Sequence, residues 1–137
     1  MLGELLILGG QLAFAIGVIF TKKLSADTNP FLVAAIVALI GALSMTPILF
    51  YFSKDLFSFS KDKIILAILA GIFWIGIGEA LYTYGLSMTT ISTASLLALS
   101  FPLFAITLGI IFFGDPINVK FIIAALLMIS GYILLVL

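Results

Sequence analysis

The chain has 137 residues, of which 64% are hydrophobic and only 9% are charged. A soluble globular domain carries about 25% charged residues, and a domain this small has no core large enough to hide so much apolar surface. Six lysines balance six acidic residues without any arginine, so no basic surface for nucleic acid is expected. With neither Cys nor His, disulfides, thiolate and imidazole chemistry and nearly all transition-metal sites are excluded. The composition predicts an integral membrane protein.

The first apolar stretch runs from about Glu4 to Thr21 and ends at Lys22 and Lys23. A signal peptide needs a basic start and a longer apolar run, so this stretch is interpreted as a retained first span. The polar loop 25–29 follows, and Pro30 is suited to open the next helix.

The second predicted span covers about Phe31 to Phe52, and the third about Ile64 to Leu86. Between them, Ser53 to Lys63 is the most polar segment, and part of it is expected to lie flat on the membrane surface. Aromatic residues are enriched at that depth. Those of this region are Phe50, Tyr51, Phe52, Phe57 and Phe59.

The fourth predicted span covers about Ile91 to Phe113 and is closed by Gly114-Asp115-Pro116, and the fifth covers about Ile117 to Leu137. A helix needs about 20 residues to cross the hydrocarbon core while it satisfies its own backbone hydrogen bonds. The sequence therefore predicts an all-α integral membrane fold, a bundle of about five transmembrane helices, as a single domain over residues 1–137.

The lysines give a weak orientation signal. If the chain crosses the membrane five times, four lysines lie on the same side as the N-terminus, namely Lys54, Lys61, Lys63 and Lys120. Lys22 and Lys23 lie on the other side. Positive loops favour the cytoplasm, so we predict a multi-pass protein of the cell (cytoplasmic) membrane with its N-terminus inside. Lysines at helix ends can snorkel, so insertion in both orientations stays open.

Glu79 is the only acidic residue deep inside an apolar span, about fifteen residues into the third span and roughly 10 Å from the nearer interface. A charged side chain at this depth costs about 2.5 kcal/mol or more, so Glu79 should face a cavity or a partner, or be protonated. This pattern fits a carboxylate that couples protons or binds a cation. The alternative is a structural polar contact with a neighbouring helix.

Aromatic residues near Glu79 in the sequence are candidates for the same pathway. On an α-helix, Tyr82 and Thr83 share the face of Glu79, whereas Trp74 points about 140° away. Tyr82, Tyr84 and Trp74 are interpreted either as lining a pocket for an apolar or cationic solute or as interfacial aromatics.

Gln11, in the middle of the first span, either reaches a central cavity or joins helices by a hydrogen bond. The predicted substrate or ion pathway is Glu79, Tyr82, Gln11 and Trp74.

Pro102 interrupts the fourth span and Pro47 the second. Each proline frees a backbone carbonyl and bends its helix. Discontinuous helices often flank transport sites, although a bend also serves packing alone. No nucleotide-binding loop, metal-ligand cluster or paired-carboxylate motif occurs, so neither a cofactor nor enzymatic activity is expected.

The second half of the chain contains a series of recognisable short segments, namely Glu79 to Leu86, Thr93 to Leu97, Phe101-Pro102-Leu103, Phe113-Gly114-Asp115 and Gly131-Tyr132-Ile133-Leu134. Together these segments resemble the EamA-type repeat of the drug/metabolite transporter superfamily. The first half matches more loosely, with Phe14-Ala15 where the family often has Trp-Gly. An Arg that the family often carries in the second span is absent around Ile36-Val37. Asp115 replaces the usual Glu, and we expect it to fix the turn.

The resemblance implies one half of an inverted-repeat architecture, because the repeat normally occurs twice and an odd number of spans inverts the second copy. The expected partners are the lipid bilayer, a small-molecule solute and a second copy of the chain in a homodimer, possibly antiparallel. The expected function is a small multi-pass transporter that moves a small metabolite or amphipathic solute by alternating access. The alternatives are a non-transporting accessory or assembly subunit and a flippase for lipid-linked substrates.

Overall fold

The computed structural model of the chain describes residues 2–136, and among them all regular structure is helical, which confirms the all-α prediction. The side chains outside the description are Glu4, Leu56, Phe57, Tyr132, Leu135 and Val136. The predictions made for Glu4, for the Phe57 and Tyr132 side chains and for Leu137 as the end of the fifth span therefore lie outside the described residues. The chain forms two compact units, Met1–Met88 (unit 1) and Thr89–Leu137 (unit 2), and each is described by itself.

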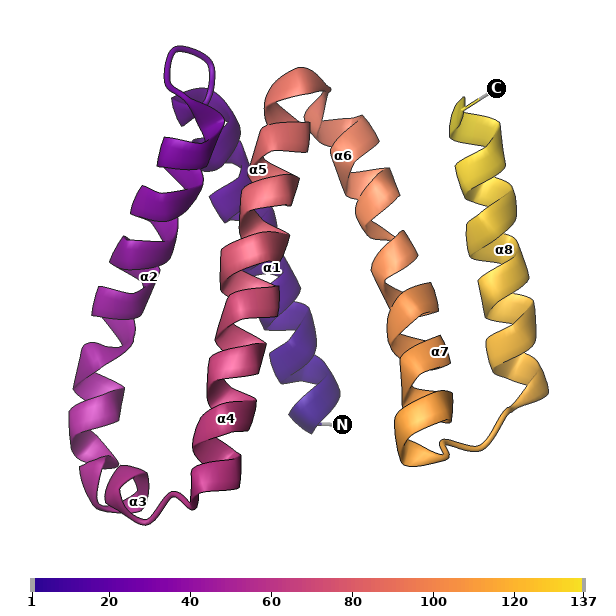
Figure 1. Cartoon of the computed structure of the whole chain (residues 1–137). Helices are drawn as coiled ribbons and strands as arrows, with labels where there is room; N and C mark the ends of the chain where they lie inside the picture. Colours follow the sequence, from indigo (N-terminus) through magenta and orange to yellow (C-terminus); the bar gives the residue numbers. More distant parts are fainter. Residues whose placement is uncertain (1, 137) are drawn as a thin grey trace. The chain divides into compact units, whose positions relative to one another are not determined.

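Unit 1 contains three long rods of helix (Figure 1). The first two are α1 (Leu2–Leu24) and α2 (Pro30–Tyr51). After the short helix α3 (Ser53–Phe57), the third rod is built from three consecutive segments. These are α4 (Lys61–Ala70), the π-helix η1 (Gly71–Gly78) and α5 (Glu79–Met88).

Side-chain caps explain where two of these rods begin. The Asn29 side chain accepts hydrogen bonds from the N–H groups of Phe31 at 2.9 Å and Leu32 at 3.3 Å. Pro30 occupies the first turn, where no N–H donor is needed, as the sequence predicts. Ser60 caps α4 through the N–H of Lys63 at 3.5 Å. These caps satisfy donors that the first turn of a helix leaves unpaired.

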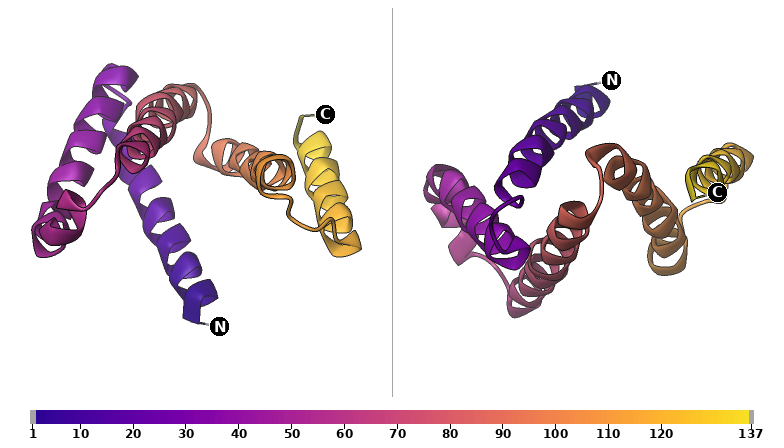
Figure 2. Two further views of the ribbon diagram at one scale, coloured as in Figure 1. Left: turned by 60° about the horizontal axis from the view of Figure 1, so that its bottom comes forward. Right: turned by 90° about the horizontal axis from the view of Figure 1, so that it is seen from above.

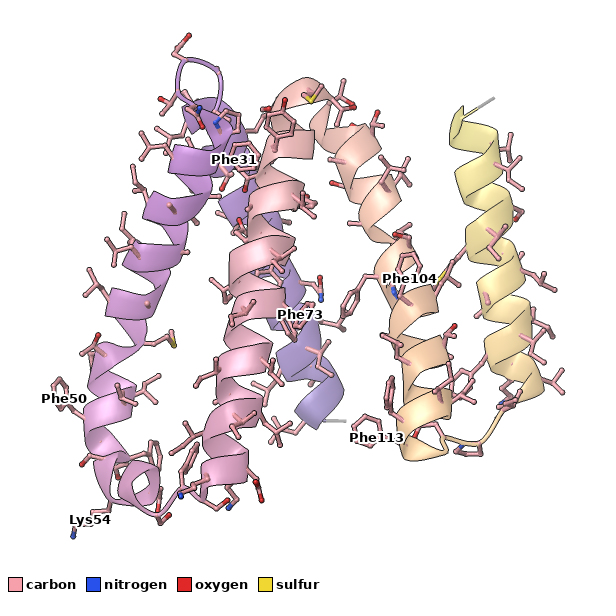
Figure 3. The ribbon with its side chains drawn as sticks, in the orientation of Figure 1. Phe31, Phe50, Lys54, Phe73, Phe104 and Phe113 are labelled. Carbon is pink, nitrogen blue, oxygen red and sulfur yellow. The ribbon has the colours of Figure 1, made fainter. Side chains whose placement is uncertain are left out.

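The packing of unit 1 is concentrated at one end. There, α2 lies beside α5, and Phe31, which is labelled in Figure 3, belongs to this end of α2. Its ring stacks on that of Tyr84 at a centroid distance of 4.9 Å. The other end of α1 leaves this pair and points away from it (Figure 2). Among the described side chains of unit 1, the buried ones lie near the last turns of α1, the first turns of α2 and the second half of α5. They are Thr21, Ser25, Val33, Ala34, Thr83 and Leu86.

The π-helix η1 widens the third rod near its middle. A π-helix closes its hydrogen bonds at i→i+5 instead of i→i+4, is rare, and frequently occurs at functional sites. The segment is rich in glycine, with Gly71, Gly76 and Gly78 among its eight residues, and none of its side chains is buried. The only other helix of unit 1 that η1 contacts outside its own rod is α2, so few side chains cover the widened turn among the described residues.

Unit 2 consists of α6 (Ile91–Ala98), α7 (Ser100–Phe113) and α8 (Val119–Val136). Thr90 caps α6 by accepting the N–H of Thr93 at 3.1 Å. The helix breaks at Leu99, whose N–H bonds to the carbonyl of Leu96, because Pro102 has no N–H to offer Ala98. Pro47, by contrast, sits inside α2, which continues through it without interruption.

Four helices of the described chain are long and apolar enough to cross a membrane: Leu5–Leu24, Pro30–Tyr51, Lys61–Met88 and Ile91–Phe113. The apolar segment Val119–Gly131 of α8 is a shorter fifth. Large apolar side chains are exposed along all of them, as lipid-facing helices require. The prediction of an all-α membrane bundle is therefore confirmed.

Candidate functional site

Glu79 lies where η1 ends and α5 begins, and its side chain is half-buried. Its backbone N–H points back to the carbonyls of Gly76 and Trp74. Its carboxylate oxygen Oε1 accepts a hydrogen bond from Oγ1 of Thr83 at 3.2 Å. This acidic group deep inside a span therefore has a hydrogen-bond partner one turn further along the same helix.

Thr83 is the buried member of this pair, with no exposed surface. A threonine in a helix often donates to the backbone carbonyl four residues earlier, which would here be that of Glu79 itself. Instead its hydroxyl donates to the Glu79 side chain. A buried hydroxyl needs a hydrogen-bond partner, so the carboxylate and Thr83 each fix the orientation of the other. The shared face predicted for these two residues is the one that the structure shows.

The aromatic candidates Trp74, Tyr82 and Tyr84 differ in their exposure and in their contacts. Trp74 is 66% exposed and belongs to η1, so the 140° separation from Glu79 expected for an α-helix does not apply. A π-turn takes more residues than an α-turn, which brings the backbone of Trp74 directly beneath Glu79. Tyr82 is half-buried on α5, and Tyr84 packs against Phe31 of α2.

Gln11 lies on α1 with its side chain exposed. Over residues 2–136, hydrogen bonds link Glu79 to Thr83 and none links it to Gln11. The roles of Glu79, Tyr82, Gln11 and Trp74 in a pathway thus remain predictions. Among residues 2–136, no three acidic side chains lie close enough together to form a possible metal site.

Lys22 makes a contact with α5 that was not predicted from the sequence. Its ammonium group donates to the carbonyl of Leu86 at 2.7 Å and to that of Ser87 at 3.2 Å, at the end of α5. The last four carbonyls of a helix have no partner within it, and a cation there also interacts favourably with the helix dipole. In the sequence, Lys22 looked only like a charge marking the end of a span.

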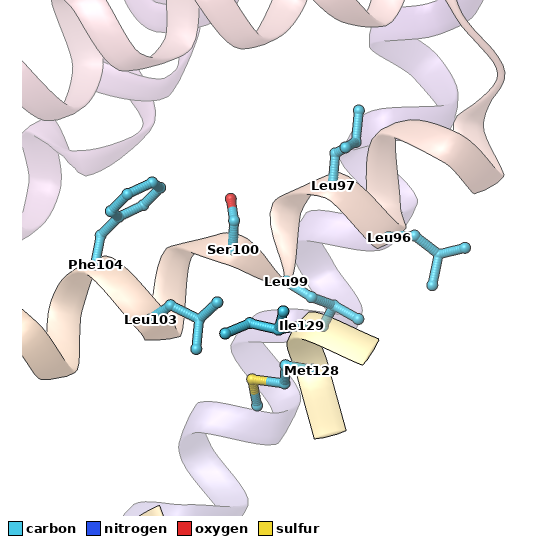
Figure 4. A pocket seen from close by; sticks show the side chains of 8 residues that line it. All are labelled: Leu96, Leu97, Leu99, Ser100, Leu103, Phe104, Met128 and Ile129. Atoms are coloured by element: carbon cyan, nitrogen blue, oxygen red, sulfur yellow. The ribbon is translucent and has the colours of Figure 1, made fainter. Parts of the chain in front are cut away.

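In unit 2, an apolar groove of about 360 Å³ lies between α6, α7 and α8 (Figure 4). It is lined by Leu96, Leu97, Leu99, Ser100, Leu103, Phe104, Met128 and Ile129. The Leu99 side chain at the helix break contributes to its wall, and Pro102 three residues later causes that break. Ser100 supplies the one hydroxyl of the lining.

The turn after α7 depends on Gly114 and Asp115. Gly114 ends the helix with φ of 67°, a left-handed conformation that favours glycine. The N–H of Asp115 then bonds back to the carbonyl of Gly109 at 3.4 Å. A Cβ atom at Gly109 would lie only 2.6 Å from the Asp115 carboxylate, so the missing side chain leaves space for that group.

Several long apolar helices, with one half-buried carboxylate inside them, define a multi-pass α-helical membrane protein. The model of the EamA-like transporter family matches residues 1–137, and the chain belongs to this family. The resemblance seen in the sequence is thereby confirmed, and the chain is assigned to the membrane transporters. Searches of curated proteins and of solved structures gave no match.

Proposed function

We propose that the protein carries a small metabolite or amphipathic solute across the cytoplasmic membrane by alternating access, with Glu79 as the coupling group. The observation that carries this proposal is the Glu79 carboxylate inside a span, hydrogen-bonded to the buried Thr83 and placed directly after a π-helix. Ionisable groups inside membranes are costly and mark ion or substrate pathways. A carboxylate there exchanges a proton for a cation without any cofactor.

Glu79 is tested in proteoliposomes that contain a pH-sensitive dye. Tetraphenylphosphonium serves as the amphipathic cation, and separate sets of amino acids, organic acids and amines represent small metabolites. Glu79→Gln keeps the shape of the side chain but removes its charge, and it should abolish solute-driven proton movement. Glu79→Asp should retain part of it, and Asp27→Asn, which changes an exposed loop acid, should retain all of it. Full coupled transport by Glu79→Gln would remove Glu79 from the mechanism.

We further propose that the five-span unit works beside a second, inverted copy of the same chain, with the pathway between them. An odd number of spans reverses the orientation of a following repeat, and such inverted pairs build alternating-access transporters. In this arrangement the exposed side chains of Gln11 and Trp74, together with the half-buried Tyr82, contribute to the cavity between the copies.

Cysteine labelling tests the inverted pair, because the chain has no cysteine of its own. Ala26→Cys and Ser58→Cys place reporters in exposed loops at opposite ends of unit 1. Ser25, although close by, is a poor reporter since it is buried and bonded to Thr21. Each reporter should react with an impermeant thiol reagent in intact cells in about half of the molecules. Labelling of only one of the two would exclude the antiparallel pair.

A lipid-handling function is the second candidate, and the groove of unit 2 favours it. Its leucine, phenylalanine and methionine lining suits an acyl chain at membrane depth. Fluorescent phospholipid analogues in proteoliposomes, reduced from outside by dithionite, distinguish the two functions. Dithionite added outside does not reach the analogues of the inner leaflet, so their fluorescence is lost only if they are moved to the outer leaflet. Rapid loss of this fluorescence without any solute-driven proton movement would favour a flippase over a solute transporter.

A further inference from the structure

We propose that Lys22 is a latch that closes one side of unit 1, and that it must release α5 whenever the protein opens toward that side. This inference rests on the proposed transport function, which it deepens by naming the residue that controls access. The side in question, called here the Lys22 end, comprises the last turn of α1, the first turns of α2 and the last turn of α5.

The contact joins two helices that are far apart in the sequence. The two acceptors, the carbonyls of Leu86 and Ser87, lie 64 and 65 residues from Lys22. Both hydrogen bonds are partly buried, and both acceptors belong to the group of carbonyls that α5 itself leaves unpaired. Lys22 therefore supplies two carbonyls at the C-terminal end of α5 with a donor and connects α1 to the helix that carries Glu79.

The remaining packing of unit 1 agrees with a closed Lys22 end. Leu86, one of the acceptor residues, is 1% exposed, and Val33 of α2 is fully buried. Thr21, the residue before Lys22, is buried as well. At the opposite end no residue of α4 or η1 is buried. Unit 1 is thus packed at the Lys22 end and unpacked at the end where α4 begins.

This asymmetry gives the latch its role. Alternating access requires the packed end to open at another stage of the cycle. A rigid apolar contact would resist such a change, whereas an ammonium group can exchange two carbonyl partners for water at the membrane surface, where lysines reach readily. The hydrogen bonds between α1 and α5 also depend on one charged side chain, that of Lys22, whereas the other packing described for this end is made by buried uncharged residues.

Distance measurements between two spin labels test the latch directly. Ala26→Cys and Met88→Cys carry the labels, since both positions are exposed and no other cysteine is present. An excess of unlabelled chain in lipid nanodiscs ensures that each signal comes from one molecule. The chain with Lys22 should show mainly one short distance. Lys22→Met should raise the ratio of long to short distances about five- to thirty-fold, the effect expected for a charge at a partly buried helix end.

Two matched variants control the experiment. Lys23→Met removes the same charge from the next residue, whose side chain is exposed, and should leave the distances unchanged. Lys22→Arg keeps the charge and the donors and should keep the short distance. If Lys22→Met does not fold, Lys22→Gln takes its place, because it keeps N–H donors without the charge. An unchanged distance distribution in the folded variant, or an equal shift in Lys23→Met, would overturn the proposal.

The readout separates this proposal from the transport function on which it rests. The label distances require no solute and no proton movement. Should Lys22→Met shift the distances while Glu79→Gln still transports normally, the latch stands and the coupling role of Glu79 falls. If Glu79→Gln is inactive and the distances do not respond to Lys22, the coupling role stands and the latch falls.

Discussion

Two long spans of this protein are interrupted near their middle, but by opposite means. In Lys61–Met88 the helix widens into the π-helix Gly71–Gly78 and keeps a continuous set of hydrogen bonds. In Ile91–Phe113 it breaks at Leu99, because a proline three residues later removes a donor. An added residue in a turn redirects every side chain that follows, whereas a missing donor mainly bends the axis. The first interruption precedes Glu79, and the second borders an apolar groove.

The largest effect is expected when a single added methyl group disturbs the π-helix. A Cβ atom at Gly78 would lie 3.0 Å from the carbonyl oxygen of Phe73, a backbone atom that cannot move easily. Gly78→Ala should therefore lower the free energy of unfolding by about 1–3 kcal/mol, as overpacking does. Denaturation by SDS from a mild detergent measures this change.

Gly76→Ala is the matched control, since its Cβ atom would meet only the Gly71 carbonyl at 3.8 Å. Alanine favours helix over glycine by up to about 1 kcal/mol, so this variant should be neutral or more stable. Equal effects of the two substitutions would show that the π-helix is not a constrained element of the fold.

A smaller effect is expected from the hydroxyl that holds Glu79. Thr83→Val removes the donor at 3.2 Å from the carboxylate while keeping the shape of the side chain. Hydrogen bonds inside membrane proteins contribute about 0.6 kcal/mol on average and up to about 1.7 kcal/mol. We therefore expect a loss of about 1 kcal/mol in unfolding free energy, together with slower solute-driven proton movement, and Thr83→Ser should restore both.

The other interrupted span supplies the control for Thr83. Thr107 of α7 donates its hydroxyl to the carbonyl of Leu103 at 2.8 Å, an acceptor that belongs to the helix backbone, and its side chain is exposed. Thr107→Val should change neither stability nor proton movement measurably. If Thr107→Val is as damaging as Thr83→Val, threonine hydroxyls matter only as general helix contacts.

The smallest effect is expected from the proline of the second interruption. Pro102→Ala returns an N–H donor for the carbonyl of Ala98 and should let α6 and α7 join into one helix, stabilising the fold by less than about 1 kcal/mol. Spin labels at Ser92→Cys and Ile111→Cys, both exposed positions, measure the change. Their separation should increase toward about 28 Å, the length of a straight helix over 19 residues. An unchanged separation would mean that the groove residues, and not Pro102, hold the bend.

Much of the fold was predictable because lipid imposes simple rules on a sequence. Apolar length and the placement of lysines and turn residues indicated where helices run, and Asn29-Pro30 indicated where α2 begins. The equal treatment of the two prolines was less successful. Pro47 and Pro102 both lack an N–H, yet α2 continues through the first and the helix breaks near the second. Local sequence does not distinguish them, since surrounding residues decide whether a helix continues past a missing donor.

The candidate site was predictable only in part. Glu79 stands out from its charge in an apolar span, and its shared face with Thr83 follows from helical spacing. The geometry of Trp74 does not, because the spacing rule assumed an α-helix where η1 is a π-helix. Three glycines in eight residues are the signal that could have suggested an irregular helix at that point.

By itself, the sequence determined that this chain is a helical membrane protein of the EamA type with one carboxylate inside a span, since hydrophobicity and charge act through composition and spacing alone. The tertiary structure decided which partners the polar groups have. It placed the ammonium of Lys22 on the carbonyls at the end of α5, and it left the two ends of unit 1 unequally packed. Contacts over more than sixty residues depend on how helices pack, and no periodicity along the chain specifies that packing.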